Sequence, residues 1–215
     1  MKVGILGSGD VGRALATGFV AAGHTVTIGA REREHPKLVE WAATTGGPGH
    51  AGTFGDAAKF GELLVVATLG VAAPEAVRRA GPALFEGKVV IDVTNPLEFT
   101  PSGAPALARL SHPSNGEMLQ ALLPKARVVK AFNIVGNQMF YRPSLPGGPP
   151  DMLIAGNDAA AKQTVTGVLH EFGWPSVIDL GGIEGARELE SLCIAWVKSA
   201  FQLHDFDIAF KLLRK

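Results

Sequence analysis

The chain has 215 residues, of which 47% are hydrophobic and 19% charged, a composition typical of a globular protein and not of a disordered one. Lysine and arginine number 20, as do aspartate and glutamate, so nucleic acid is not expected to be the main partner. The single cysteine, Cys193, excludes an internal disulfide and favours a reducing, cytoplasmic setting. We expect no signal peptide, because a strand pattern begins at Lys2, and no membrane span, because the apolar runs are short.

The first predicted unit is a strand, a glycine-rich turn and a helix. The apolar run Val3–Leu6 predicts a buried strand, and the G-x-G-x-x-G of Gly7, Gly9 and Gly12 follows directly, before an apolar run of helical spacing. In this context the motif is typical of a dinucleotide site. The first glycine permits a tight turn, the second lets a pyrophosphate approach the backbone, and the third lets the helix lie close to the strand. The alternative is a turn that is merely rich in glycine.

Strand and helix patterns then alternate along the chain. Further strands are predicted at 24–28, 51–54, 62–68, 88–93, 127–132, 151–155 and 176–180. Helices are predicted at 36–45, 56–60, 74–81, 114–123, 157–173 and from 184 onward, with Asp56, Ser114 and Asn157 as caps. Residues 99–115 are expected to form a lid or to be poorly ordered. The pattern predicts an α/β fold, a Rossmann-type doubly wound and mostly parallel sheet over residues 1–182, with a C-terminal helical segment, 183–215, packed on it.

The end of the second predicted strand indicates which dinucleotide is bound. NAD sites usually carry an acidic residue there, whereas this strand ends in Ala30 and Arg31. A guanidinium can pair with the 2′-phosphate of NADP, and Arg33 and His35 could add to the positive field. NADP is therefore the expected cofactor. Two alternatives stay open: Arg31 as a solvated surface charge, and Glu32 turned inward, which would restore NAD binding.

Several segments of the sequence resemble two related families. They are VGILGSGDVGRALA at 3–16, the GAR that ends the second strand, DVTNP at 92–96, VVKAFN at 128–133, AGND at 155–158 and ARELESL at 186–192. The chain resembles the NADP oxidoreductases that depend on the deazaflavin coenzyme (factor 420). It also resembles the cytoplasmic oxidoreductase domain of the six-transmembrane epithelial antigen of prostate metalloreductases. The resemblance spans nearly the whole chain. Since the metalloreductases continue into a membrane domain, we expect that this chain does not pass electrons across a bilayer unaided.

Carried over residue by residue, the resemblance implies a cofactor site along the glycine turn and the ends of four strands. Beside Gly7 and Gly12, the pyrophosphate would be lined by Ser8, Gly9, Asp10 and Val11, and the 2′-phosphate held by Ala30 and Arg31. Thr68 and Leu69 would flank the nicotinamide ribose, Asn95 and Pro96 would shape the far wall, and Ala131, Phe132 and Asn133 would approach the nicotinamide. The families usually have serine where Ala30 stands, which predicts weaker binding of the 2′-phosphate. The Asp10 carboxylate is expected to lie in the first helical turn and favour the helix dipole.

The expected function is an NADPH-dependent oxidoreductase that transfers hydride between NADP(H) and a flavin (FMN or FAD) or deazaflavin coenzyme. Such a reaction needs no protein nucleophile, because the protein aligns two rings and excludes water, so no catalytic residue is assigned. His204, beside Asp205 and Asp207, is the best acid–base candidate, although a solvated helix end explains it as well. No histidine has metal-ligand spacing, and no metal is expected.

Alternative functions and assemblies stay open at this point. One is the reduction of another small acceptor, including ferric or cupric ions through a bound flavin. Another is a dinucleotide-binding sensor without turnover. An apolar stripe near the C-terminus is expected to belong to the core, with a homodimer face as the alternative; it consists of Leu189, Leu192, Cys193, Trp196 and Ala200.

Overall fold

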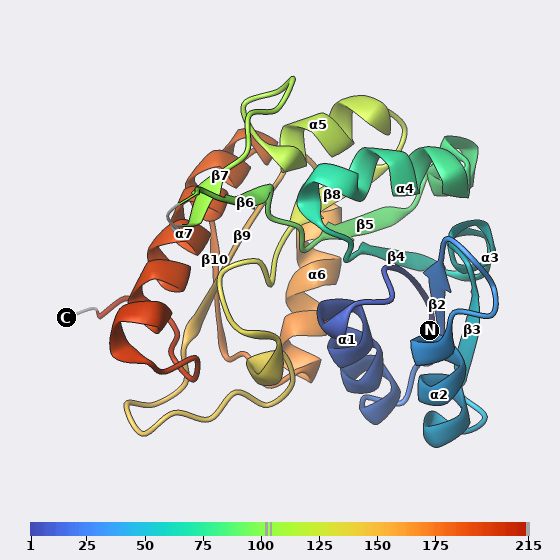
Figure 1. The fold of residues 1–215 in the computed structure, drawn as a ribbon, viewed down its shortest axis with the longest axis horizontal. Coiled ribbons are helices and arrows are strands. Elements are labelled where there is room, and N and C mark those ends of the chain that lie inside the picture. The colour runs from blue at the N-terminus through green and yellow to red at the C-terminus, as the bar shows by residue number, and fades with distance from the viewer. Residues whose placement is uncertain (102, 104, 214–215) are drawn as a thin grey trace.

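A single large sheet runs through the molecule, with helices on both of its faces (Figure 1). The computed structural model describes residues 1–101, 103 and 105–213. Within them, eight strands pair in the order β10-β9-β8-β5-β4-β1-β2-β3. These strands are β1 (Lys2–Leu6), β2 (Thr25–Ala30), β3 (Gly49–Thr53), β4 (Leu63–Val66), β5 (Val89–Asp92), β8 (Arg127–Lys130), β9 (Asp151–Gly156) and β10 (Ser176–Asp179). The α-helices are α1 (Asp10–Ala21), α2 (Pro36–Thr45), α3 (Phe54–Phe60), α4 (Ala73–Ala80), α5 (Asn115–Leu122), α6 (Ala159–Glu171) and α7 (Ala186–Leu203), joined by the 3₁₀ helices η1 (Gly70–Ala72), η2 (Pro82–Phe85), η3 (Asn137–Met139) and η4 (Ile183–Gly185).

The sheet is mostly parallel and doubly wound, which confirms the predicted fold class. Neighbouring strands of the large sheet run parallel except β8 and β9, which are antiparallel with Val129 opposite Gly156. Strand β1 lies between β2 and β4, so the chain reverses its direction of travel along the sheet at this point. In such sheets the crevice at the carboxyl ends of the two strands beside the reversal is the usual ligand site.

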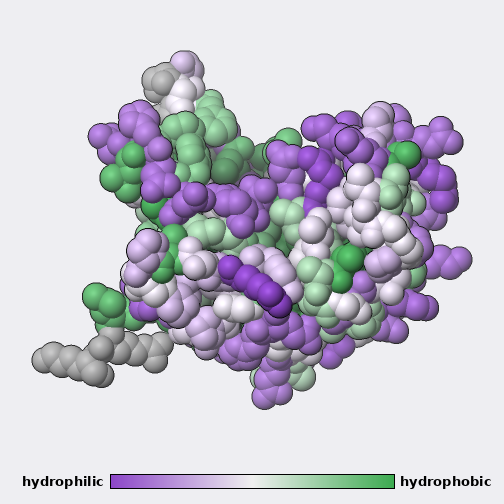
Figure 2. Space-filling view, turned by 90° about the horizontal axis from the view of Figure 1, so that it is seen from below, coloured by the Kyte–Doolittle hydropathy of each residue, from purple (hydrophilic) through white to green (hydrophobic). Residues whose placement is uncertain are grey.

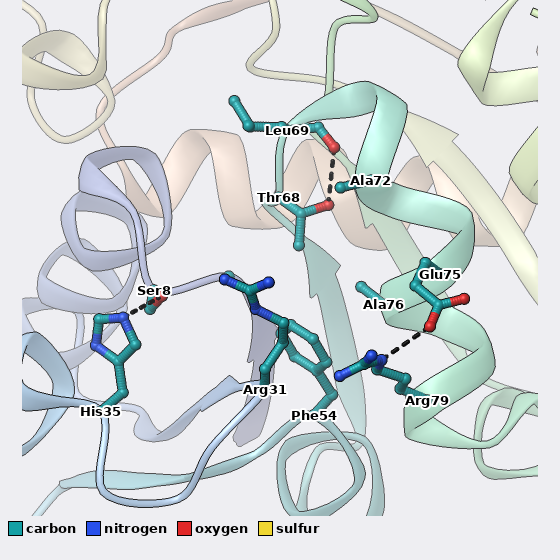
Figure 3. A pocket seen from close by; sticks show the side chains of 11 residues that line it. Ser8, Arg31, His35, Phe54, Thr68, Leu69, Ala72, Glu75, Ala76 and Arg79 are labelled. Atoms are coloured by element: carbon teal, nitrogen blue, oxygen red, sulfur yellow. Dashed lines mark hydrogen bonds and ion pairs between the residues drawn. The ribbon is translucent and has the colours of Figure 1, made fainter.

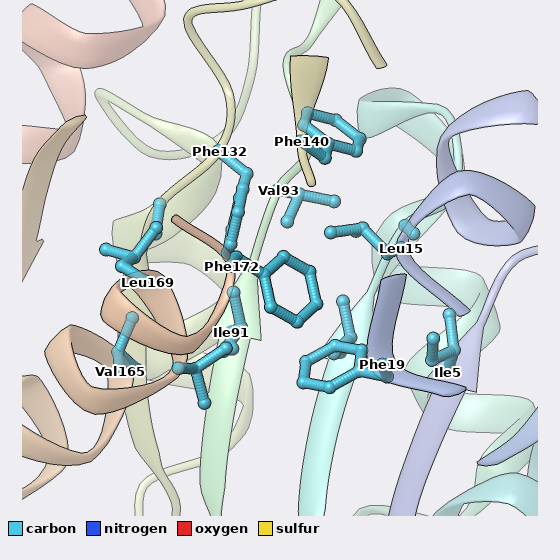
Figure 4. Close-up of a cluster of buried hydrophobic side chains, with 14 of the residues drawn as sticks. Ile5, Leu15, Phe19, Ile91, Val93, Phe132, Phe140, Val165, Leu169 and Phe172 are labelled. Carbon is cyan, nitrogen blue, oxygen red and sulfur yellow. The ribbon is translucent and has the colours of Figure 1, made fainter. Parts of the chain in front are cut away.

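Each face of the sheet supports its own hydrophobic core. In β4, Val65 belongs to a cluster of buried residues that includes side chains of α1, α2 and α6, whereas the neighbouring Leu64 belongs to one that includes side chains of α3, α4 and α5. On the first face the rings of Phe19 and Phe172 meet edge to face, with their centroids 4.7 Å apart (Figure 4). Fully burying one such side chain stabilises the fold by ~1.5–3 kcal/mol. These two cores hold the strands whose carboxyl ends form the crevice.

Helix α7 covers the C-terminal part of the molecule and packs on β9 and α5 (Figure 1). The apolar stripe is confirmed as core: Leu189, Cys193 and Ala200 are buried, and Leu192 and Trp196 are half-buried. The helix ends at Leu203, so the expected helical pattern to the end of the chain is wrong over its last part. The helix stops because His204 adopts a left-handed conformation with φ 50°.

Two of the predicted helix caps are wrong by one or a few residues. Thr53 caps α3 through its hydroxyl, which accepts from the Asp56 N–H, while the Asp56 carboxylate accepts from the Thr53 N–H at 2.8 Å. Asp158 caps α6, and the side-chain oxygen of Asn157 instead accepts from the Ile183 N–H at 2.9 Å. Thr53 and Asp56 form a capping box, with the predicted Asp56 at its third helical position, whereas Asn157 and Asp158 are adjacent residues that both suit a cap.

The stretch between β5 and α5 contains a small hairpin, which was not predicted because prolines in a sequence argue against strands. Strands β6 (Leu97–Phe99) and β7 (Pro105–Leu107) pair antiparallel, with Leu97 opposite Leu107. The expectation of a poorly ordered loop is therefore wrong where the hairpin lies, whereas a role as a lid stays a prediction; residues 102 and 104 lie outside the described residues. Proline is tolerated because this two-stranded ladder leaves an edge free of pairing. Beyond it, Ser114 caps α5 as predicted and accepts from the Glu117 N–H at 3.1 Å.

The surface carries no broad hydrophobic patch on the face seen in Figure 2, where hydrophobic residues stand in small groups among hydrophilic ones. Among the large apolar side chains that are exposed, Leu69 lies beside the crevice and Leu203 at the end of α7. None of the helices in the described ranges combines the length and apolar character needed to cross a bilayer.

Candidate functional site

The three glycines of the first turn have different surroundings. Gly7 has φ 141°, and a Cβ there would lie 2.3 Å from the carbonyl oxygen of Ala67. A Cβ on Gly12 would lie 2.1 Å from the carbonyl oxygen of Gly7, so α1 rests directly on the turn. A Cβ on Gly9 would meet nothing within 4 Å. The geometry predicted from the motif is therefore confirmed: Gly7 and Gly12 permit close packing, and Gly9 leaves open space in front of the helix.

The first turn of α1 is free to receive an anion. Gly9 is its N-cap residue, and no side chain caps the helix. Asp10 lies in the first turn, as predicted, and its carboxylate pairs with Nη2 of Arg13. Nη1 of the same guanidinium donates to the carbonyl oxygen of Ser8 at 2.6 Å. Because Arg13 offsets the charge of Asp10, the uncapped N–H groups and the positive end of the helix dipole are left as an anion site.

A cleft of about 370 Å³ opens beside this turn (Figure 3). It lies at the carboxyl ends of β1, β2 and β4, and α4 forms its far wall. Predicted site residues that line it are Gly7, Ser8, Arg31, Thr68 and Leu69. Other lining residues are His35, Phe54, Ala72, Glu75, Ala76 and Arg79. The structure thus brings the glycine turn, the end of the second strand and the loop after β4 to one cavity.

Arg31 is an exposed cation at the centre of this cleft (Figure 3). Among the described residues, no side chain forms a hydrogen bond or ion pair with its guanidinium. Arg33 is not available in the same way, because its Nη2 lies 2.7 Å from Oδ2 of Asp56. Hydrogen bonds from Thr53, and to a lesser extent Arg33, hold the pKa of the Asp56 carboxyl below its usual value. Glu32 is exposed and does not line the cleft.

His35 lies on the other side of the glycine turn, at the start of α2. Its Nε2 lies 3.3 Å from the Ser8 hydroxyl, and its buried Nδ1 has no partner among the described residues. The contact joins the α2 entrance to the turn and fixes the Ser8 side chain at the edge of the cleft. His35 therefore lines the cleft, whereas Arg33 does not.

The predicted residues after β5 and β8 form a second group beside the cleft. Nδ2 of Asn95 donates to the carbonyl oxygen of Asn133 at 2.8 Å, and Nδ2 of Asn133 donates to Oδ1 of Asn95 at 2.9 Å. Nδ2 of Asn133 also donates to the carbonyl oxygen of Leu189 in α7. This reciprocal pair holds the two loops together, but neither asparagine nor Pro96 lines the cavity of about 370 Å³.

Phe132 and Ala131 are buried below this second group. The Phe132 ring is 1% exposed and packs edge to face on Phe140, with centroids 5.5 Å apart. Its backbone has φ 62°, which is uncommon for an aromatic residue. Ala131 is fully buried and donates its N–H to the carbonyl oxygen of Asp92. Ring and backbone of Phe132 are therefore both buried, its N–H donates to Sδ of Met152, and neither Phe132 nor Ala131 lines the cleft.

A buried network of charges lies under the same loops. Nζ of Lys130, in β8, lies 2.9 Å from Oδ2 of Asp92 and 2.8 Å from Oε1 of Glu190, and it also donates to the Thr94 carbonyl oxygen. Oε1 and Oε2 of Glu190 accept from the N–H of Asn115 at 3.0 and 3.1 Å. Burial would lower the pKa of Lys130, but the carboxylates of Asp92 and Glu190 outweigh it and raise that pKa. Burial raises the pKa of Glu190, against the opposing effect of Lys130.

This network reaches the loop that follows β4. Nδ2 of Asn115 donates to the Gly70 carbonyl oxygen at 3.1 Å and to the Thr94 hydroxyl. A Cβ on Gly70 would lie 2.3 Å from the carbonyl oxygen of Asn95, so the loops after β4 and β5 are in direct backbone contact. The buried charges therefore fix the loop of Thr68 relative to the loops after β5 and β8.

Comparison with known proteins identifies the family. Residues 2–96 match the family model described as NADP oxidoreductase, coenzyme F420-dependent. The solved structure of a putative F420-dependent NADP reductase from Arthrobacter sp. FB24 is 36% identical, with 100% of each chain covered and a TM-score of 0.92. The chain belongs to this family of NADP-dependent oxidoreductases. The resemblance inferred from the sequence segments is confirmed.

Two curated relatives of the oxidoreductase differ in how much of their length is matched. Metalloreductase STEAP3 of Rattus norvegicus is 33% identical over 207 residues, which cover 89% of this chain but 36% of the relative. The F420-dependent NADP reductase of Methanocaldococcus jannaschii is 29% identical over 205 residues and is covered to 89%. The oxidoreductase thus spans about a third of the metalloreductase and most of the archaeal reductase.

Sequence reasoning missed two groups of residues in this oxidoreductase. The first is the α4 wall, although Ala72, Ala76 and Arg79 have the spacing of one helix face and follow soon after Leu69. The second is the buried network, for which the signal was a lysine at position 130 between the apolar residues Val129 and Ala131. His204, the acid–base candidate, is exposed at the end of α7 and does not line the cleft.

Cys193 is buried and does not line the cleft. Burial raises the pKa of the Cys193 thiol to about 12, so the reactive thiolate is scarce at neutral pH. Within the described residues, no cluster of three or more histidine, cysteine or acidic side chains has the arrangement of a metal site.

Proposed function

We propose that this oxidoreductase transfers hydride between NADP(H) and a flavin or deazaflavin coenzyme. The observation that carries the proposal is a cleft that is lined by Gly7, Ser8 and Arg31 and opens beside the uncapped N-terminus of α1. Within the described residues, the Arg31 guanidinium has no partner. The open space at Gly9 suits the approach of a pyrophosphate, and the cation suits a 2′-phosphate. The residues present therefore fit a bound NADP(H), which supplies the hydride.

The chain's own part in the reaction is to bind, orient and exclude water. In this proposal, Gly7 to Gly12 hold the pyrophosphate, with Ser8, Asp10 and Val11 contributing backbone N–H groups or edges of the turn. Arg31 holds the 2′-phosphate beside Ala30, which has no side-chain donor to add. Thr68 and Leu69 flank the nicotinamide ribose, because their loop joins the cleft to the second group of residues.

The same proposal places the nicotinamide near the paired amides of Asn95 and Asn133. Pro96 shapes the far wall, and the buried residues Ala131 and Phe132 support this end from below. Leu69 is 78% exposed and presents an apolar side chain where a planar acceptor would lie. Alignment of two rings with water displaced accounts for hydride transfer without a protein nucleophile, so no catalytic residue is assigned.

Similarity to two kinds of relative supports two acceptors. The archaeal relative named as an F420-dependent NADP reductase is matched over 89% of its length, which favours a deazaflavin acceptor. The relative named as a metalloreductase is 33% identical but matched over 36% of its length. It supports the second candidate, reduction of ferric or cupric ions through a bound flavin.

The acceptor is tested by mixing the purified protein and NADPH with one acceptor at a time and following the nicotinamide absorbance. We expect rapid oxidation with the deazaflavin coenzyme or with FMN or FAD. Oxidation by a ferric chelate only when flavin is added would favour the second candidate. Tight NADPH binding without oxidation by any acceptor would make the protein a dinucleotide sensor and overturn the proposal.

Homodimer formation and a cytoplasmic location belong to the same proposal. The side chains of Phe201, Leu203 and Phe206 are about half exposed or more at the end of α7, and they could be covered by a second copy. The lone, buried Cys193 suits a reducing compartment. Sedimentation equilibrium distinguishes a dimer from a monomer, and a monomer at all concentrations would contradict the assembly.

A further inference from the structure

The wall of the cleft opposite Arg31 is one face of α4 and its entrance. Ala72, Ala76 and Arg79 follow each other at helical spacing, so their side chains lie on the same face. Figure 3 shows Arg31 and Arg79 on either side of the cavity, with the Phe54 ring between them. The alanines leave room beside the helix. Phe54 is 8% exposed, and its ring provides an apolar surface there.

Arg79 is oriented by a neighbour on its own helix. Its Nε donates to Oε1 of Glu75, one turn earlier, at 2.8 Å. Its terminal Nη1 and Nη2 have no partner among the residues that the structure describes. A guanidinium held through Nε keeps its two terminal N–H₂ groups for a further acceptor, and a phosphate is the anion that this planar fork suits.

Next to Arg31, the end of β2 and the loop after it offer few further side-chain donors to a phosphate. Ala30 carries no polar side chain, and Arg33 is paired with Asp56 at 2.7 Å. The cationic side chains of the cavity are therefore Arg31 and Arg79, against the single carboxylate of Glu75. A phosphate group that carries nearly two negative charges at neutral pH matches two guanidinium groups better than one.

We propose that Arg79 is a second specificity-determining residue, which binds the adenosine 2′-phosphate from the wall opposite Arg31. The inference rests on the proposed placement of the adenosine end in this cleft. It assigns to α4 a part of the preference for NADP(H) over NAD(H). The apolar surface of Phe54 and the two alanines faces the same space and suits the adenine base.

The test is a set of binding measurements by isothermal titration calorimetry, with NADPH, NADH, 2′,5′-ADP and 5′-AMP as ligands. For Arg79→Ala we expect affinity for NADPH and 2′,5′-ADP to fall about tenfold, the effect of one charge-assisted hydrogen bond. NADH and 5′-AMP, which lack the 2′-phosphate, should bind as they do to the unmodified protein. Arg31→Ala should show the same selectivity.

Arg78→Ala is the matched control, because Arg78 is exposed on the same helix but lines a separate groove with His112 and Met118. It should leave all four affinities unchanged. Arg79→Lys, which keeps the charge but loses the planar fork, should recover part of the affinity for 2′,5′-ADP. Urea midpoints of all variants should agree, since all three arginines are exposed.

Each other outcome overturns a stated part of the reasoning. Equal losses for NADPH and NADH with Arg79→Ala would mean that Arg79 contacts the adenine or acts through folding, and the inference fails. Unchanged binding with Arg79→Ala also refutes it. If Arg31→Ala remains selective in either case, the proposed 2′-phosphate site stands without Arg79. If neither variant is selective, that site itself fails.

Discussion

Replacing Lys130 with methionine should destabilise the fold strongly, because the lysine is the only cation in the described part of the buried network. Its ammonium group is fully buried and contacts Asp92 at 2.9 Å and Glu190 at 2.8 Å. Methionine has a similar length, so packing in β8 is largely kept while the charge is lost. The variant would leave two carboxylates facing each other in a dry interior.

The magnitude follows from the burial of all three groups. Removing one partner of a buried ion pair typically destabilises a protein by ~3–5 kcal/mol. A domain has a total stability of roughly 5–15 kcal/mol, so the variant should remain folded but lose a large share of it. Adding Glu190→Gln should recover part of the loss, since the double variant contains one uncompensated carboxylate instead of two.

Urea unfolding followed by tryptophan fluorescence measures this effect, and the midpoint should fall while the m-value stays constant. Lys125→Met is the control, because Nζ of Lys125 pairs with Oε2 of Glu86 at 3.2 Å while 71% exposed. Such a surface pair contributes about 0–1 kcal/mol. A loss for Lys130→Met as small as that of the control would refute the reasoning.

Three further predictions concern the glycine turn and two carboxyls. Gly9→Ala should keep the urea midpoint, since the new Cβ meets nothing within 4 Å, but should weaken NADPH binding measured by calorimetry. Gly12→Ala should lower both the urea midpoint and the NADPH affinity, because overpacking destabilises a protein by ~1–3 kcal/mol. Burial raises the folded-state pKa of Glu190 above 4.5, so urea midpoints should decline as pH rises through that raised pKa, and Glu190→Gln should remove this decline. The hydrogen bond from Arg187 lowers the pKa of Glu117 below 4.5, so stability is lost as pH falls through that lowered pKa. Arg187→Ala should reduce this loss in a plot of urea midpoint against pH, and an unchanged loss at acid pH would contradict the prediction.

The sequence predicted features that depend on neighbours along the chain. The turn of Gly7 to Gly12 is such a feature, because the strand, the turn and the helix that it joins are consecutive. The start of α2 at Pro36 and the Ser114 cap of α5 are others. The choice between Asn157 and Asp158 as a cap failed because both side chains can accept the same N–H, and only the position of Ile183 separates them.

The sequence could not pair residues that meet only through the topology of the sheet. Lys130 and Glu190 are 60 positions apart, and Asn115 and Gly70 are 45 apart. Lys130 could be recognised as an unusual charge between the apolar residues Val129 and Ala131, but its partners depend on how α7 and α5 return to the sheet. The wall of α4 was missed for a similar reason, since Arg79 faces Arg31 only after the chain has crossed from β2 to β4.

The two ends of the proposed cofactor site are held in physically different ways, and this bears on how each can change. At the adenosine end, Arg31 and Arg79 are exposed and contact few other groups, so substitutions there should alter affinity with little effect on stability. At the other end, the loops carrying Thr94 and Asn95 are fixed by the buried bonds of Lys130 and Glu190, so a change that moves them also leaves buried charges unpaired. Cofactor preference can therefore shift by single substitutions, whereas moving the loops of the nicotinamide end requires compensating changes in α5, β8 and α7 together.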